Sequence, residues 1–319
     1  MKLLVIARDW NHFASRQLTH NLLLELAKIT ELFVWHERGD DISQILNQLD
    51  LQPDFVLVLE YYETNASRVS GLSRLTIPYA ISLMDLHWDV EFRKELIERE
   101  SISYIFTPCR DAFNKWYPEF KDRMLWLPHH VNTDIFKDYG LPKDIDYLLM
   151  GSISASVYPL RDRILYEMRD SPGFVYHEHP GYRYIADDEN AFIGEKYARE
   201  INRAKIFFTC GGANNYPVAK YYEALACNTL LLAPTFSELE DLGFIPGTHF
   251  VAIDINDYRE KAEYYLGHEQ ERLQIALQGY KMVRDRHSTT RRAAELLTAI
   301  EGIISLHYGD SDFGGLTNE

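Results

Sequence analysis

Short apolar segments alternate with amphipathic segments along almost the whole chain, and this alternation restricts the fold more than any other feature. Runs such as Leu3–Ala7 and Phe55–Leu59 are typical of buried strands. Between them, apolar residues recur at helical spacing, as Leu18, Leu22 and Leu26 do. Strands separated by helices pair in parallel, in a sheet that helices cover on both faces. The sequence therefore predicts an α/β fold.

The alternation occurs twice, in two series separated by the turn-rich stretch Pro128–Pro142. The first series predicts strands at 3–7, 32–35, 55–59, 79–83 and 104–107, with helices at 42–49, 90–99 and 111–116. The second predicts strands at 147–150, 174–177, 206–209, 230–233 and 250–253. Its helices are expected at 160–168, 195–203 and 218–226, and long helices between 258 and 304.

A chain of 319 residues exceeds the usual size of a single hydrophobic core. We therefore predict two doubly wound domains, at 1–140 and 141–290. A C-terminal helix at 291–306 is expected to cross back to the first domain, and 307–319 to form a loose polar tail. In such open sheets, ligands bind beyond the carboxyl ends of the strands, so the loops at those ends are the candidates for chemistry.

Composition excludes several kinds of partner. The formal net charge of -15 argues against a broad nucleic-acid or anionic-membrane surface, although a few focused cations can still bind a small anion. The three cysteines form no CxxC pair, which fits a reducing compartment. No apolar stretch reaches 18 residues, so no transmembrane segment is expected. We predict a soluble, cytoplasmic protein; the sequence does not indicate its oligomeric state.

The segment between Thr209 and Pro234 is the most informative for function. A predicted strand leads into Gly211 and Gly212, where a backbone without Cβ atoms can approach a ligand closely. Pro217 suits the first turn of the following helix, whose free N–H groups and positive dipole end can bind phosphate. Lys220 adds a cation there. Glu223 is a poor phosphate ligand but a good acceptor for two vicinal hydroxyls.

The fragment beginning Lys220-Tyr-Tyr-Glu-Ala-Leu-Ala-Cys-Asn-Thr resembles the donor-binding helix and strand of GT-B glycosyltransferases, in the retaining group marked by two glutamates eight positions apart. Tyr216-Pro217 before Glu223-Ala224 is similar to the spelling of the CgeB-like branch. The resemblance covers roughly residues 79–300. It implies two Rossmann-like domains facing a central cleft, the first on the acceptor side and the second binding the nucleotide-sugar donor.

The resemblance also implies roles for individual residues. Glu223 matches the glutamate that binds the donor ribose, whereas Asn215 stands where the family has the glutamate that contacts the donor sugar. Asn228 replaces a family glycine. A basic residue near Arg161 usually meets the diphosphate. The predicted donor-binding residues are Gly151, Ser152, Arg161, Gly211, Gly212, Asn215, Tyr216, Pro217, Lys220 and Glu223.

Asp85 and His87 are the candidate catalytic residues, because they follow a predicted strand end that would face the cleft. In many relatives a His-Asp pair occurs near this place and its histidine contacts the sugar. Here Met84 occupies the aligned histidine position. A structural turn explains the segment equally well. A metal site involving Asp89 lacks a second group of ligands at suitable spacing.

Two further histidines, His177 and His179, have a spacing that would suit a metal, but Pro180-Gly181 makes a loop the preferred interpretation. Leaving-group charge can be neutralised by a metal ion or by fixed cations and dipoles. Lys220 and Arg161 supply fixed cations, and the start of the helix after Pro217 supplies a dipole. The nearest acidic pairs, Asp187-Asp188 and Asp310-Ser-Asp312, lie in polar context. We therefore expect no metal.

Together, the resemblance implies a hexosyltransferase-type enzyme that uses a nucleoside diphosphate sugar, with UDP as the expected nucleotide, and no other cofactor. The acceptor would be a hydroxyl of a polysaccharide, a protein or a small molecule, and transfer would retain the anomeric configuration without a metal ion. Two alternatives stay open: a nucleotide-sugar epimerase of the same fold, and a non-catalytic subunit that binds a nucleotide sugar.

Overall fold

The computed structural model describes residues 1–11, 13, 17–37, 41–60, 69–181, 183–186 and 190–312. These residues form two compact units. The N-terminal unit comprises Met1–Asp9, Leu22–Pro128 and the chain from Arg292 onward, and the C-terminal unit comprises Trp10–Asn21 and His129–Arg291. The chain thus leaves the first sheet near residue 128, before the expected domain boundary at 140.

The N-terminal unit is built on a parallel sheet of six strands in the order β2-β1-β3-β4-β5-β6. Its strands are β1 (Lys2–Ile6), β2 (Glu31–Trp35), β3 (Phe55–Val58), β4 (Tyr79–Ser82), β5 (Ile105–Thr107) and β6 (Met124–Trp126). The α-helices between them are α1 (Gln17–Ile29), α2 (Ile42–Leu49), α3 (Val90–Arg99) and α4 (Arg110–Trp116), with 3-10 turns at Leu72–Arg74 and Pro118–Arg123.

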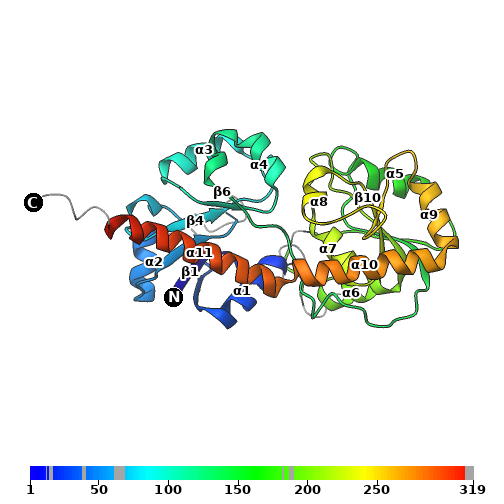
Figure 1. Cartoon of the computed structure of the whole chain (residues 1–319), viewed down its shortest axis with the longest axis horizontal. Coiled ribbons are helices and arrows are strands. Elements are labelled where there is room, and N and C mark those ends of the chain that lie inside the picture. Colours follow the sequence, from blue (N-terminus) through cyan, green and yellow to red (C-terminus); the bar gives the residue numbers. More distant parts are fainter. Residues whose placement is uncertain are drawn as a thin grey trace, which may run out of the picture. The chain divides into compact units, whose positions relative to one another are not determined.

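One core of this unit joins residues from both ends of the sequence. Leu3 and Val5 of β1 point to the same face of the sheet and pack with Leu26 of α1. The same cluster contains Leu296 and Ile300 of the last helix, α11 (Thr289–Asp312). α1 and α11 accordingly lie side by side along this sheet (Figure 1).

The C-terminal unit holds a second parallel sheet, in the order β11-β10-β9-β7-β8. Its strands are β7 (Ile145–Met150), β8 (Phe174–His177), β9 (Ala204–Phe208), β10 (Leu230–Ala233) and β11 (Val251–Ala252). The helices are α5 (Pro159–Met168), α6 (Gly194–Arg203), α7 (Ala219–Ala226), α8 (Ser237–Asp241), α9 (Tyr258–Gly267) and α10 (Glu269–His287).

Helices flank this sheet in the manner that the strand–helix alternation predicts. Ile164 of α5 and Ala262 of α9 join the cluster made by Leu149, Phe208 and Leu232 of the central strands. α6 contacts β9, and α7 contacts β10 and α10. Both units are therefore doubly wound α/β layers, which confirms the predicted fold class.

Most predicted elements occur within one or two residues of their expected bounds. α2, α3, β8 and β10 match in full. β6 was not predicted, because a strand of three residues between the 3-10 turn Pro118–Arg123 and the turn-rich stretch Pro128–Pro142 gives too little pattern. α11 continues to Asp312, so the expected loose tail is helical at 307–312. In the described part of the chain, no helix is long and apolar enough to span a membrane.

Candidate functional site

The C-terminal sheet has a topological switch point between β7 and β9. From β7 the chain moves outward to β8, then returns to place β9 on the opposite side of β7. The loops that follow β7 and β9 diverge at this point, which is where open α/β sheets bind ligands. Gly151 directly follows β7, and Cys210 and Gly211 come shortly after β9.

Gly151 is the position at which the predicted cations meet. Its φ of +119° suits glycine, and a Cβ placed there would lie 2.8 Å from Cε of Lys220 and 3.6 Å from Nη1 of Arg161. The two cations come from α7 and α5, 59 positions apart in the sequence. The structure thus brings Gly151, Arg161 and Lys220 together at one edge of the sheet. Their binding of phosphate stays a prediction.

Arg161 is a buried residue whose guanidinium is fixed on several sides. Nη2 donates to Oγ1 of Thr209 at 3.0 Å and to the carbonyl of Cys210 at 2.9 Å. The guanidinium carbon lies 4.0 Å from the ring centroid of Tyr158. These contacts tie the start of α5 to the end of β9, so the positive charge is held in place before any ligand arrives.

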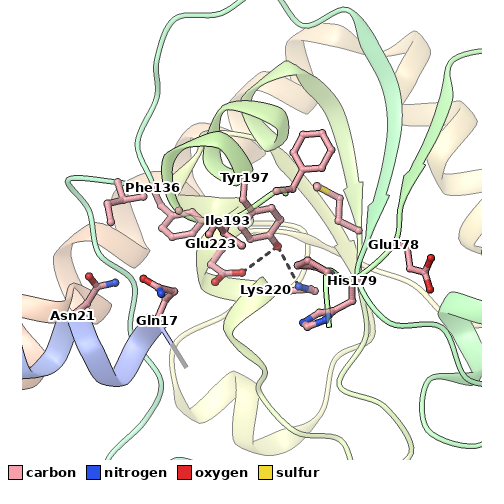
Figure 2. Close-up of a pocket in the computed structure, with 15 residues that line it drawn as sticks. Gln17, Asn21, Phe136, Glu178, His179, Ile193, Tyr197, Lys220 and Glu223 are labelled. Carbon is pink, nitrogen blue, oxygen red and sulfur yellow. Dashed lines mark hydrogen bonds between the residues drawn. The ribbon is translucent and has the colours of Figure 1, made fainter. Parts of the chain in front are cut away.

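A pocket opens beside this cluster, within the C-terminal unit (Figure 2). Its polar wall carries Tyr197 of α6 with Lys220 and Glu223 of α7. The hydroxyl of Tyr197 donates to Oε2 of Glu223 at 3.2 Å and accepts from Nζ of Lys220 at 3.3 Å. The lining residues are Gln17, Asn21, Ile135, Phe136, Met150, Gly151, Glu178, His179, Pro180, Phe192, Ile193, Gly194, Tyr197, Lys220 and Glu223.

The local sequence explains why α7 presents this face. Ala, Leu, Lys and Glu are strong helix formers, and they make up most of Ala219–Ala226. The helix ends before Asn228, which has a φ of +51°. Asparagine tolerates this left-handed conformation, in which a helix commonly closes on a glycine. The replacement of the family glycine by Asn228 therefore leaves the end of the helix intact.

The charges in the pocket have shifted pKa values. Burial raises the pKa of the Glu223 carboxyl, against the opposing effects of Lys220 and the Tyr197 hydrogen bond. Burial, together with the neighbouring positive charge of Arg161, lowers the pKa of Lys220 to about 8 although Glu223 opposes the shift. Lys220 is thus a cation at neutral pH that loses its proton under mildly basic conditions.

His179, in the loop after β8, also lines the pocket. Its Nδ1 accepts a hydrogen bond from the backbone N–H of Gly181 at 2.9 Å. Burial, with the charges of Lys220 and Arg161, lowers the pKa of His179 to about 4. The ring is therefore neutral at pH 7, with its proton on Nε2. His177, by contrast, contacts Glu200 through Nε2 at 2.8 Å.

The glycines of the loop after β9 are required because backbone atoms of this loop and of the loop before α5 approach them closely. The N–H of Tyr216 donates to the carbonyl of Gly211 at 3.0 Å, which folds the loop back on itself. A Cβ on Gly211 would lie 2.5 Å from the carbonyl oxygen of Tyr216, and one on Gly212 would lie 2.7 Å from that of Val157. Close packing within the protein thus accounts for both glycines.

The remaining predicted donor residues do not line the pocket. Pro217 was expected in the first turn of the helix, but α7 begins at Ala219, with Val218 as its N-cap residue. Asn215 is exposed and has a φ of +51°. Ser152 follows Gly151 and is partly exposed. Arg161, Gly211, Gly212 and Tyr216 are not lining residues either.

Asp85 and His87 belong to the N-terminal unit, whereas every lining residue of the pocket belongs to the C-terminal unit. They lie in the turn after β4, where Asp85 is exposed and has a φ of +47°. Nη1 of the buried Arg93 donates to the carbonyls of Met84 at 2.8 Å and Asp85 at 3.3 Å. Burial lowers the pKa of His87. Their catalytic role stays a prediction.

No cluster of three or more His, Cys, Asp or Glu side chains suited to a metal ion occurs among the residues that the structure describes. Asp187 and Asp188 lie outside the described residues, as do the side chains of Asp310 and Asp312.

Tyr197, His179, Phe136 and Phe192 line the pocket and were absent from the predicted set. Tyr197 lies in a predicted helix, but nothing in the local pattern distinguishes it from other helical tyrosines. Its link to Glu223 joins residues 26 positions apart. His179 was interpreted as part of a loop, and only the position of that loop next to α7 reveals its contact with the pocket.

Comparisons with a family model and with solved structures relate this chain to glycosyltransferases. Residues 161–298, less than half of the chain, match a family model described as glycosyl transferase-like. A search of curated proteins finds no match. The sucrose-phosphate synthase of Thermosynechococcus elongatus is 10% identical, with a TM-score of 0.66 over 96% of this chain and 100% of that one.

Two further solved structures have the same fold. HepE of Anabaena, in complex with UDP and glucose, is 9% identical, with a TM-score of 0.63 over 95% of this chain and 100% of that one. A glycosyltransferase from Rickettsia africae ESF-5 is 10% identical, with a TM-score of 0.62 over 95% of this chain and 98% of that one. Two parallel sheets and this structural likeness agree: the chain has the GT-B fold, and its residues 161–298 match a glycosyl transferase-like family model.

Proposed function

We propose that this protein transfers a hexose from a UDP-sugar to a hydroxyl acceptor, with retention of configuration and without a metal ion. The observation that carries the proposal is the meeting of Lys220 and Glu223 in one pocket, beside Gly151 and Arg161, at the switch point of the C-terminal sheet. A carboxylate suits vicinal hydroxyls and repels phosphate, whereas the two cations attract phosphate. A nucleoside diphosphate sugar carries both groups.

The chemical demands of the reaction match these residues. Transfer breaks the bond between the anomeric carbon and the β-phosphate oxygen and forms a bond from that carbon to the acceptor oxygen. The proton of the acceptor hydroxyl passes to the departing diphosphate or to water. Negative charge grows on the departing diphosphate, and cations held in place beforehand stabilise it at no cost of reorganisation. Lys220 and the fixed guanidinium of Arg161 have this role in our proposal.

The choice of UDP draws on the HepE structure, which contains UDP and glucose. Retention draws on the likeness of the segment around Glu223 to the retaining group and to its CgeB-like branch. Asp85 and His87 are proposed to contact the substrate from the acceptor side. A net charge of -15 disfavours a nucleic-acid acceptor. The acceptors that fit are a polysaccharide, a protein or a small molecule.

The test is to incubate the purified protein with UDP-glucose, UDP-galactose and UDP-N-acetylglucosamine, with and without acceptors, and to follow products by mass spectrometry. Release of UDP with a glycosylated product supports the transferase, and the anomeric coupling constant of that product by NMR reports retention or inversion. An isomerised donor indicates the epimerase instead. Binding without turnover indicates a non-catalytic subunit.

Metal independence is tested by repeating the assay after exhaustive EDTA treatment. We expect turnover to persist, and to fall strongly in Arg161→Ala and Lys220→Ala. Lys205→Ala is the matched control, because Lys205 pairs with Asp146 at 2.6 Å and does not line the pocket. If chelation abolishes activity, Mg²⁺ or Mn²⁺ restores it, and both Arg161→Ala and Lys220→Ala are silent, this account of leaving-group stabilisation is wrong.

A further inference from the structure

Lys220 and Glu223 are three positions apart on α7, a spacing at which opposite charges on a helix lie side by side and commonly pair. In this pocket the phenol of Tyr197 stands between them (Figure 2). It accepts from the ammonium at 3.3 Å and donates to the carboxylate at 3.2 Å. The contact between the two charges thus runs through a neutral hydroxyl.

The ring of Tyr197 is held in position by another aromatic residue of the pocket. It comes from α6, and its ring packs edge-on against Phe136 with centroids 5.8 Å apart. Nζ of Lys220 lies 5.2 Å from the centroid of the same ring. A hydroxyl has one proton to donate, and that proton goes to Glu223, which leaves a lone pair for Lys220. The phenol therefore has a fixed direction of hydrogen bonding.

We infer that Tyr197 is a positioning residue that keeps Lys220 and Glu223 apart, so that the pocket selects ribonucleoside diphosphates over their 2′-deoxy and monophosphate counterparts. The inference rests on the proposed function. A carboxylate neutralised by a neighbouring ammonium is a weaker acceptor for ribose hydroxyls. An ammonium occupied by a carboxylate is a weaker partner for phosphate. Separation by Tyr197 leaves each group available for its own part of the donor.

Tyr197→Phe tests this arrangement with little change in shape, because the ring and its contact with Phe136 remain. Without the hydroxyl, the Glu223 carboxylate loses a donor, and Lys220 is free to pair with it directly. Tyr221→Phe is the matched control. Tyr221 lies on the same helix, and its hydroxyl donates to the carbonyl of Pro234 at 2.8 Å, outside the set of lining residues.

Calorimetric titration with UDP, 2′-deoxy-UDP and UMP measures the selection. The wild type should bind UDP more tightly than either of the others. In Tyr197→Phe the ratio of UDP to 2′-deoxy-UDP affinity should fall about tenfold, the effect of one hydrogen bond to a charged group, and the ratio of UDP to UMP affinity should also fall. Tyr221→Phe should keep both ratios.

The double variant Tyr197→Phe/Glu223→Gln separates a positioning role from a direct contact. If Tyr197 acts through Glu223, adding Tyr197→Phe to Glu223→Gln should not change the ratio of UDP to 2′-deoxy-UDP affinity further. Unchanged ratios in Tyr197→Phe, or a full tenfold effect in the Glu223→Gln background, overturn the inference while the proposed function stands.

A measurement without ligand keeps the two proposals distinguishable. In protein labelled with ¹³C-lysine, the Cε signal of Lys220 should titrate at a higher pH in Tyr197→Phe than in the wild type, because direct pairing with Glu223 favours the charged ammonium. An unchanged midpoint overturns the separating role of Tyr197. If the wild type binds none of the three nucleotides, the proposed function and the selection fail together, and this titration alone decides the separation.

Discussion

At the scale of single residues, the pocket combines groups whose properties depend on one another. Lys220 stays positive at neutral pH despite burial and the charge of Arg161, since Glu223 lies nearby. Glu223 in turn accepts a hydrogen bond from the neutral phenol of Tyr197 through Oε2. A substitution in this group therefore changes the charge state of its neighbours as well as its own contacts.

Glu223→Ala should weaken UDP binding by about 1.5–3 kcal/mol while the fold stays intact, because the ribose hydroxyls lose a charged acceptor. Calorimetric titration measures the change. Glu263→Ala is the control, since Glu263 is exposed on α9 and does not line the pocket. An unchanged affinity in Glu223→Ala removes this residue from the ribose site.

UDP affinity should decrease as the pH rises from 7 to 9, because Lys220 has a pKa of about 8 in the free protein and must be protonated to attract the diphosphate. The terminal phosphate of UDP is already ionised in this range, since its second pKa is near 6. Lys220→Arg keeps its charge and should show a flatter profile. Equal slopes for the two proteins would count against Lys220 as the titrating group.

The sequence predicted Glu223, Lys220, Gly151 and Arg161 as one group, and the structure brings them together. Local motifs predicted this group, since each residue lies at a strand end or on the helix that follows one. Tyr197 was not predicted, because its hydroxyl reaches Glu223 only through the packing of α6 against α7. The same limit applies to His179, whose loop reaches the pocket through the tertiary fold.

At the scale of elements, the loop between β9 and α7 is a tight structure that positions the helix start. Its glycines are needed because other backbone atoms approach them closely. The sequence indicated the loop and the helix but placed Pro217 inside the helix. Proline is compatible both with the first turn of a helix and with the residues just before it, so its presence does not fix where the helix begins. The register of the helix depends on how the loop closes between Gly211 and Tyr216.

Gly211→Ala should destabilise the C-terminal unit by about 1–3 kcal/mol, because its Cβ would meet the backbone oxygen of Tyr216, which cannot move aside as a flexible side chain can. Thermal unfolding by scanning calorimetry measures the effect. Gly267→Ala is the control in the same unit, since a Cβ at Gly267 would meet no atom within 4 Å apart from its chain neighbours and its own helix backbone. A drop in Tm of equal size in both variants contradicts the steric explanation.

At the scale of the whole molecule, each unit has its own sheet and core, and the N-terminal core is completed by the last helix. Leu296, Ile300 and Ile303 join residues of β1, β3 and α1 in one cluster. The sequence analysis expected a helix at 291–306 that crosses back to the first domain. Its contact with β1 joins the two ends of the chain, and no local pattern reports which strand the helix meets.

Ile300→Ala should destabilise the N-terminal unit by about 2–5 kcal/mol, because Ile300 is fully buried in that cluster. Leu306→Ala, at a residue 63% exposed on the same helix, should change stability by no more than about 0.5 kcal/mol. Calorimetry with and without UDP assigns the transitions, since a bound ligand stabilises the unit that binds it. A shift confined to the UDP-sensitive transition would contradict the assignment of Ile300.

The division of the chain has a consequence for exchanging parts between proteins of this architecture. The path passes from one unit to the other after Asp9, after Asn21, after Pro128 and after Arg291. A chimera made at a single crossover near the middle would therefore pair a β1–β6 sheet with a foreign α11, and a β7–β11 sheet with a foreign segment from the amino terminus. To exchange the proposed donor specificity, residues 129–291 should be transplanted together with residues 10–21, while the host keeps its own chain from Arg292 onward, because neither unit is contiguous in the gene.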